Sequence, residues 1–99
     1  MLSQYVHRGW TERSGLPYSV VWSIEQTPDG YLWLGTRGGL TRYDGARFRH
    51  FTVANTPQLT SNEIRELFVD SSGVLWIGTY GGGLVRYADG TFAQVTAPD

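Results

Sequence analysis

The segment GYLWLGT at residues 30–36 returns as GVLWIGT at residues 73–79, and this pair of segments decides the fold. The two copies lie 43 residues apart, and the match extends upstream, where Leu16 aligns with Leu59. An additional glycine in the second copy, Gly83, then changes the offset to 44, so that residues 40–52 align with residues 84–96. A fixed period of about 20 to 50 residues is typical of repeat architectures. The chain is therefore a tandem duplication from Leu16 onward.

Each copy is expected to form four short strands, because runs of β-branched and aromatic residues alternate with Gly, Asp and Ser turn signals. The expected strands are residues 20–26, 31–36, 40–43 and 47–52 in the first copy, and 63–69, 74–79, 84–87 and 91–96 in the second. Four-stranded meanders that repeat about every 40 to 45 residues are typical of β-propeller blades. The expected fold class is all-β: two propeller blades and a lone N-terminal strand, belonging either to a larger propeller or to an oligomeric ring.

Several motifs resemble the two-component regulator propeller repeat. In the first copy they are Leu16-Pro17, DGYLWLGT at residues 29–36 and GLTRYDG at residues 39–45; the second copy has GVLWIGT and then GGLVRY at residues 82–87. Thr60 departs from the pattern, since the family usually has proline there. The resemblance implies the sensory part of a bacterial transmembrane receptor, with a periplasmic or other extracytoplasmic propeller followed by a further β domain, a membrane helix and a cytoplasmic histidine kinase or diguanylate cyclase.

The repeat divides the chain into a lead-in with a strand at residues 1–15, a first blade at residues 16–58 and a second blade at residues 59–99. Two blades cannot close a ring, and stacked repeats generally need about three neighbours to bury their faces. The expected partners are therefore further blades, from the same longer chain or from identical chains. Residues 2–5 align with the last strand of each blade and would complete the final blade of a full ring, which favours an excerpt of a longer chain.

Composition excludes several classes of protein. Eight Arg and nine Asp plus Glu give a formal net charge of −1, which does not favour nucleic acid or an anionic membrane as a partner. The absence of Cys excludes disulfides and thiolate chemistry. No apolar run reaches the roughly 18 residues of a spanning helix, and the first residues lack the pattern of a signal peptide.

No pattern predicts catalysis, a cofactor or a metal site. The glycine-rich segments at residues 35–39 and 78–83 are followed by strands, whereas a phosphate cradle needs a helix N-terminus. Asp29 and Asp70 each supply one carboxylate to a turn, too few oxygens for calcium. His7 and His50 lack a paired histidine, and no serine lies in a Gly-x-Ser-x-Gly elbow. The segment is expected to be non-catalytic.

Residues that recur at the same position in both copies are expected to be structural. They are Trp33 and Trp76, Gly35 and Gly78, and Thr36 and Thr79. The tryptophans are expected to pack between neighbouring blades, with a platform for stacking a sugar as the alternative.

Residues that differ between the copies are the candidates for ligand binding. Successive turns of a meander lie at opposite ends, so the loops between blades share one rim with the turn that follows the second strand of each blade. The candidates on this rim are Tyr18, Arg37, Asn62 and Tyr80, with Trp22 and Arg65 expected to face the channel from the inner strands. Arg and aromatic side chains suit a small-molecule or glycan ligand. The alternative is an ordinary solvated rim.

Three functions remain open at this point. The first is a ligand-sensing or interaction module of a signalling receptor. The second is a glycan-binding, lectin-like propeller. The third is a fragment of a sialidase-type glycosidase, which would need clustered Arg and acidic residues on the inner strands of several blades.

Overall fold

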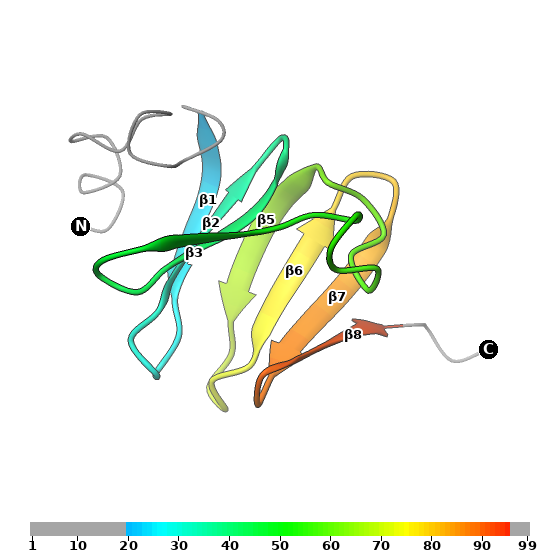
Figure 1. The fold of residues 1–99 in the computed structure, drawn as a ribbon. Coiled ribbons are helices and arrows are strands. Elements are labelled where there is room, and N and C mark those ends of the chain that lie inside the picture. The colour runs from blue at the N-terminus through cyan, green and yellow to red at the C-terminus, as the bar shows by residue number, and fades with distance from the viewer. Residues whose placement is uncertain (1–19, 96–99) are drawn as a thin grey trace.

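The computed structural model describes residues 20–95, and within this range it consists of strands without a helix. The first sheet contains β1 (Val21–Gln26), β2 (Leu32–Thr36), β3 (Gly39–Tyr43) and β4 (Phe48–Phe51) (Figure 1). The second contains β5 (Ile64–Val69), β6 (Leu75–Thr79), β7 (Gly83–Ala88) and β8 (Thr91–Val95). The predicted lead-in strand at residues 1–15 and the end of the last predicted strand, Thr96, lie outside the described residues. No helix within the described range could span a membrane.

Both sheets are antiparallel meanders in which each strand pairs with its neighbour in sequence, β1-β2-β3-β4 and β5-β6-β7-β8. This topology confirms the all-β, four-strand blade predicted from the repeat. The sheets occupy residues 21–51 and 64–95; the blade boundaries proposed at residues 16–58 and 59–99 stay predictions.

The strand ends differ slightly from the prediction, and hydrogen bonds explain the differences. β4 is shorter than residues 47–52, because the N–H of Arg47 donates to Asp44 and the N–H of Thr52 donates to Asn55. β7 is longer than predicted, because Ala88 pairs with Thr91 around a two-residue turn. That turn places Asp89 at φ 51° and Gly90 at φ 79°, as a tight hairpin requires.

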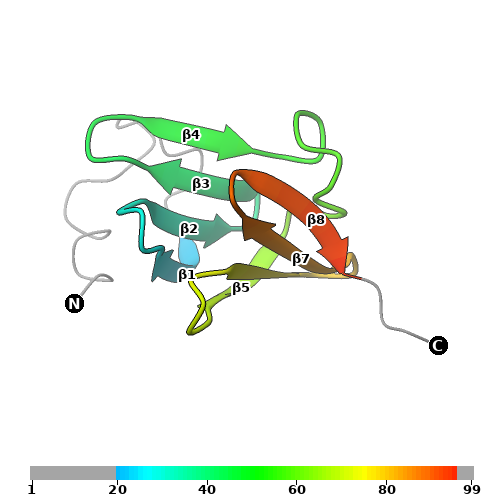
Figure 2. The same ribbon diagram turned by 90° about the horizontal axis from the view of Figure 1, so that it is seen from below.

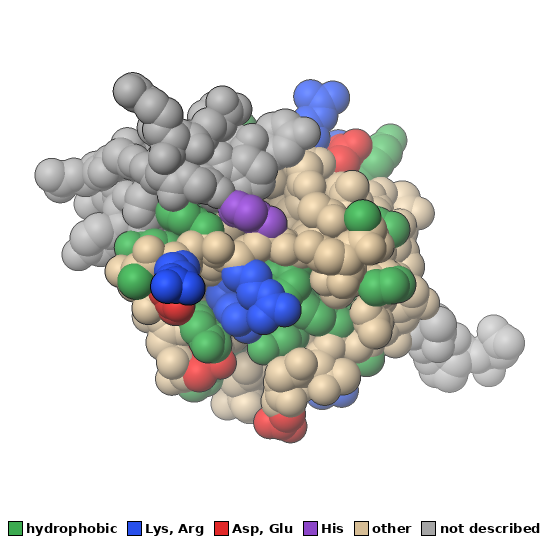
Figure 3. Space-filling model, in the orientation of Figure 1, with side chains coloured by type: hydrophobic (Ala, Val, Ile, Leu, Met, Phe, Trp, Pro, Cys, Tyr) green, Lys and Arg blue, Asp and Glu red, His purple; other side chains and the backbone are tan. Residues whose placement is uncertain are grey.

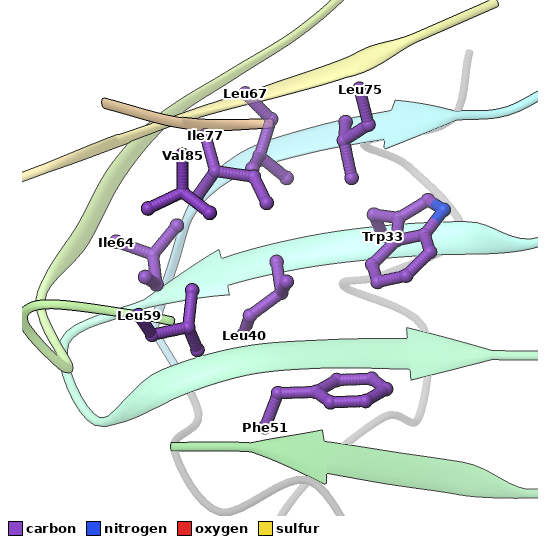
Figure 4. Packing of buried hydrophobic residues seen from close by; sticks show 9 residues of the cluster. All are labelled: Trp33, Leu40, Phe51, Leu59, Ile64, Leu67, Leu75, Ile77 and Val85. Atoms are coloured by element: carbon purple, nitrogen blue, oxygen red, sulfur yellow. The ribbon is translucent and has the colours of Figure 1, made fainter. Parts of the chain in front are cut away.

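The core lies between the two sheets, because side chains alternate along each strand. On β2, Trp33 belongs to the main core cluster and Leu34 to a separate cluster with Val21 and Ile24. The main cluster brings together buried residues of both sheets and one residue, Leu59, of the loop between them. Figure 4 shows its members: Trp33, Leu40, Phe51, Leu59, Ile64, Leu67, Leu75, Ile77 and Val85. The two repeats therefore pack face to face as neighbouring blades.

The innermost strands approach closely where the blades meet. β1 and β2 both contact β5, and the two views place β1 beside β5 (Figures 1 and 2). A Cβ added at Gly35 would lie 2.8 Å from Cγ2 of Ile64, so a side chain at this position would collide with β5. Beside this contact, the N–H of Leu67 donates to the hydroxyl of Ser23 across the interface at 3.0 Å.

The second sheet repeats the pattern of the first, and its outer face has no neighbour among residues 20–95. Trp76 occupies the position of Trp33 but is only half-buried. Leu84, the counterpart of Leu40, is exposed, and so is Phe68. Trp76 and Leu84 thus repeat, on this outer face, the positions at which Trp33 and Leu40 pack against the second blade.

Candidate functional site

Each inner strand contains one irregularity at the same repeat position. The register of β1 against β2 shifts between Val21 and Ser23, and the register of β5 against β6 shifts between Ile64 and Glu66. The additional residues are Trp22 and Arg65, which align with each other at the 43-residue offset. Bulges of this kind redirect a side chain and are over-represented next to functional sites. Val21 pairs with Thr36 and Ile64 with Thr79, so the bulges place Trp22 and Arg65 near the rim formed by the β2–β3 and β6–β7 turns. Figure 1 shows these two turns at the same end of the sheets.

The guanidinium of Arg65 lies between two aromatic rings. Its Cζ is 4.8 Å from the ring centre of Trp22 and 4.7 Å from that of Tyr80, so one blade supplies one ring and the other blade supplies the second. All three side chains are open to solvent: Tyr80 is 61 % exposed, Trp22 40 % and the Arg65 side chain 52 %. Glu63, which the sequence did not single out, lies 3.6 Å from the guanidinium. We call Trp22, Arg65 and Tyr80 the rim cluster.

Hydrogen bonds fix the turn that carries Tyr80. The N–H of Tyr80 donates to the carbonyl of Glu63 at 2.9 Å, which ties the β6–β7 turn to the start of β5. The hydroxyl of Thr60 donates to the carbonyl of Gly82 and so ties the same turn to the loop between the blades. Threonine in place of the usual proline thus gives the loop a hydrogen bond that proline could not supply.

The other predicted rim residues are not part of this cluster. Arg37 is exposed in the β2–β3 turn, and no contact with the rim cluster is found for it within residues 20–95. The side-chain oxygen of Asn62 accepts the N–H of Val53 at 2.7 Å, so it already braces the loop between the blades. Tyr18 lies outside the described residues.

The repeated residues have equivalent places in the two blades. Trp33 is fully buried, and its Nε1 donates to the hydroxyl of Thr27 at 2.9 Å, which leaves its ring without an open face for a ligand. The hydroxyls of Thr36 and Thr79 donate to the carbonyls of Gly39 and Gly83, both at 2.9 Å, and close the β2–β3 and β6–β7 turns. In contrast to Gly35, Gly78 has room for a Cβ, whose nearest neighbour would be 3.6 Å away.

Asp70 is the turn residue with the densest set of hydrogen bonds. Its Oδ2 accepts Nε1 of Trp76 at 2.8 Å, and its Oδ1 accepts the N–H groups of Ser72 at 2.8 Å and Val74 at 3.0 Å. The bond from Trp76, followed by that from the Val74 N–H, lowers the pKa of Asp70 from its ordinary value of 3.8. The backbone N–H groups of Arg47 and Ala46 likewise lower the pKa of Asp44. Both carboxylates therefore act as acceptors that hold turns, as predicted for Asp70.

We expect Asp70→Asn to weaken the dependence of thermal stability on acid. A folded-state pKa below 3.8 means that the carboxylate stabilises the fold above that pH and that this stabilisation is lost as pH falls through the lowered pKa. The fall in melting temperature between about pH 5 and pH 2 should therefore be smaller in the variant. Asp89→Asn, which removes a carboxylate from the exposed β7–β8 turn, is the control. An equal fall in the native chain and Asp70→Asn would contradict this role.

No reactive constellation is found in the described part of the chain. Among residues 20–95 no group of three His, Cys, Asp or Glu side chains could hold a metal ion. His50, one of the two histidines, contacts the hydroxyl of Thr41 through Nδ1 at 3.1 Å. The rim cluster offers a cation, two exposed rings and a nearby carboxylate, an arrangement suited to binding.

A family model matches the chain twice, once in each copy of the repeat. Residues 15–38 and 58–81 match the model described as "Two component regulator propeller". Each match contains one copy of the Leu-Trp-x-Gly-Thr segment and the start of the glycine-rich turn that follows it.

Two relatives extend this result. A protein named "Histidine kinase P4" from Formosa agariphila is 39 % identical over 69 residues, which cover 65 % of this chain and 5 % of that protein. The crystal structure of the extracellular domain of a putative hybrid two component system from B. thetaiotaomicron superposes with a TM-score of 0.73 at 28 % identity, covering 87 % of this chain and 12 % of that one. The chain thus spans a small fraction of either relative and resembles the propeller of a two-component sensor.

Proposed function

We propose that the chain is a non-catalytic ligand-sensing and interaction module of an extracytoplasmic receptor, because residues 15–38 and 58–81 match the model described as "Two component regulator propeller". The two relatives, a histidine kinase and the extracellular domain of a putative hybrid two component system, support this proposal. A periplasmic location and an output through a kinase or diguanylate cyclase elsewhere in a longer chain are part of it.

The observation that carries the proposal is the rim cluster. Arg65 stands between Trp22 and Tyr80 at 4.8 and 4.7 Å, at the junction of two blades and open to solvent. Exposed cation–π pairs contribute only about 0.5–1 kcal/mol, so the fold gains little from leaving two large rings in water. A ligand that stacks on either ring and accepts hydrogen bonds from the guanidinium would make use of the whole cluster.

The carboxylates of the described turns support binding rather than catalysis. General acid catalysis near neutral pH requires a carboxyl with a raised pKa. The two aspartates with a displaced pKa, Asp44 and Asp70, are displaced downward, because N–H groups stabilise their charged forms. Both side chains therefore hold turns in their charged forms, and neither has the raised pKa of a general acid.

A lectin-like role is the second candidate, and the exposed rings favour it. Trp22 and Tyr80 offer planar faces of the kind on which sugars stack, beside an arginine that forms forked hydrogen bonds. This role differs from the first only in whether binding is passed on to an output domain.

The outer face of the second sheet supports a further blade as partner. Trp76, Leu84 and Phe68 leave a large apolar surface uncovered among residues 20–95. In the first sheet the counterparts Trp33 and Leu40 are fully buried against the neighbouring blade. We propose that a third blade, from a longer chain or from an identical chain, covers this face in the same way.

The binding role is tested by titrating the chain with a panel of neutral and acidic oligosaccharides, read by tryptophan fluorescence. We expect at least one oligosaccharide to change the emission, because Trp22 would be in contact with it. Arg65→Ala should weaken that binding by about tenfold, which corresponds to about 1.4 kcal/mol. Arg47→Ala, which removes the same charge from the exposed turn before β4, should leave it unchanged.

The same titrations separate binding from catalysis. The oligosaccharide should be recovered unaltered after long incubation, as shown by mass spectrometry. Equal affinities of the native chain and Arg65→Ala would remove the rim cluster as the binding site, and conversion of the sugar to a product would contradict a non-catalytic module.

A further inference from the structure

A second surface with the character of a binding site lies between the outer strands of the two blades. A cavity of about 300 Å³ is found there. Its lining includes Arg42 and Arg49 from the first blade, Phe92 and Thr91 from the second, and Gln58 from the loop between them. The space-filling view shows basic side chains in the middle of one face, bordered by hydrophobic ones (Figure 3). We call this cavity the outer groove.

The two arginines of the outer groove are direct cross-strand partners. In the β3–β4 ladder, Arg42 pairs with Arg49, so both side chains project from the same face of the sheet. Like charges directly opposite each other destabilise an antiparallel pair. An anion between the two guanidinium groups would remove this repulsion.

No acidic side chain of residues 20–95 neutralises either arginine. The one ion pair found in this part of the chain joins Arg65 to Glu63 and involves neither Arg42 nor Arg49. The lining of the outer groove also contains no Asp or Glu. The positive charge of the groove is therefore uncompensated within the described residues.

Comparison of the two blades shows which arginine the fold requires. Arg42 aligns with Arg86, and each lies over the repeated tryptophan of its own blade, at 5.5 Å from Trp33 and 5.8 Å from Trp76. Arg49 aligns with Ala93, and Arg86 pairs with Ala93 in the second sheet. The blade thus forms without an arginine at this position, so Arg49 is an addition that the architecture does not explain.

Neighbouring side chains hold both guanidinium groups in place. Arg42 lies 4.2 Å from the ring centre of Tyr31, and its Nη1 donates to the hydroxyl of Tyr87 at 3.3 Å. Arg49 lies 5.1 Å from the ring centre of Phe51. Stacking on rings leaves the N–H edges of a guanidinium free to donate, and two such forks match the oxygens of a planar or tetrahedral oxoanion.

From this geometry we propose that the outer groove binds an oxoanion, as a carboxylate, sulfate or phosphate group, between Arg42 and Arg49. Gln58 and Thr91 add polar groups to the lining. Both blades contribute to the groove. The proposal is independent of ligand binding at the rim cluster.

The experiment is an NMR titration of the ¹⁵N-labelled chain with sodium acetate, sodium sulfate and sodium phosphate, each at an ionic strength held constant with sodium chloride. We expect saturable shifts of the arginine Nε–H signals of Arg42 and Arg49 with at least one of the three anions. Acetate against sulfate and phosphate separates a carboxylate site from a site for tetrahedral anions. Arg49→Ala, which copies the residue of the second blade, should weaken binding at least tenfold, and Arg47→Ala should leave it unchanged.

Three outcomes would overturn the proposal. The first is the absence of saturable shifts at Arg42 and Arg49 with all three anions. The second is an equal loss of binding in Arg49→Ala and Arg47→Ala, which would indicate a general charge effect. The third is saturable binding whose shifts centre on Arg65 rather than on the outer groove. The two-dimensional spectrum of Arg49→Ala shows directly whether the variant remains folded.

Discussion

Replacing Trp33 by alanine is expected to lower the free energy of unfolding by about 3–5 kcal/mol, the usual cost of removing a buried aromatic side chain. The same change at Trp76 is expected to cost less than half as much. The two residues occupy equivalent positions in the repeat, and they differ in what covers them. Trp33 is fully buried between the sheets, whereas Trp76 is half-buried on the outer face.

The contacts of Trp33 explain the large expected effect. Its ring centre lies 4.7 Å from that of Tyr87 and 6.4 Å from that of Phe92, both on the second sheet, and 5.9 Å from that of Phe51. Removing the indole would leave a cavity in the interface and would leave the hydroxyl of Thr27 without the Nε1–H donor. Removing Trp76 breaks its bond to Asp70 but opens no enclosed cavity within residues 20–95.

Urea unfolding followed by circular dichroism measures both changes. Trp33→Phe, which retains an aromatic ring, is the milder variant if Trp33→Ala does not fold. Equal losses of unfolding free energy in Trp33→Ala and Trp76→Ala would contradict the packing of the second blade on the first.

Gly35→Ala is expected to destabilise the chain by about 1–3 kcal/mol, the usual cost of overpacking. The added Cβ would lie 2.8 Å from Ile64 Cγ2 and 3.1 Å from the Ile64 carbonyl oxygen, closer than atoms at a packed interface approach. β1 and β2 would have to move away from β5 to relieve this contact. The effect comes from the interface, since Gly35 is not among the glycines with positive φ.

Gly78→Ala is the matched control for this prediction. Gly78 has the same repeat position, but its added Cβ would meet Glu66 at ordinary distances of 3.6 and 3.7 Å. We expect little change in unfolding free energy, or a slight gain because alanine reduces the entropy of the unfolded chain. Thermal unfolding of Gly35→Ala and Gly78→Ala under the same conditions tests this expectation. A loss of stability in Gly78→Ala as large as that in Gly35→Ala would rule out the interface as the cause.

The fold could be predicted from the sequence because the information lies in local repetition. The Leu-Trp-x-Gly-Thr segments mark the second strand of each blade, and the Asp-Gly pairs mark turns. Each observed strand begins or ends within one or two residues of the expected position. β4 is shorter than expected because the Asp44 and Asn55 side chains accept backbone N–H groups that would otherwise extend the ladder.

The site could be predicted only in part, because it depends on how the blades dock. Topology placed Tyr80 on the rim and Trp22 and Arg65 in the channel, on the inner strands. The contact of Arg65 with both rings could not be predicted, because it requires both bulges and the blade interface. Asn62 looked like a ligand residue, since nothing in the sequence shows that Val53 donates to it. The Arg42–Arg49 pair was missed, because a two-residue turn at Asp44-Gly45 would place Arg42 opposite Arg47. The observed turn spans four residues, 44–47, and pairs Arg42 with Arg49.

The most direct test of the packed-blade structure is a nuclear Overhauser spectrum of the Trp33 indole in the intact chain. The account predicts cross-peaks from Trp33 to the rings of Tyr87 and Phe92 on the second sheet. It also predicts slower hydrogen exchange of the Trp33 indole N–H than of the Trp76 indole N–H, because the first is buried. Cross-peaks confined to the first sheet, with equal exchange at both tryptophans, would show that the two repeats do not pack as neighbouring blades.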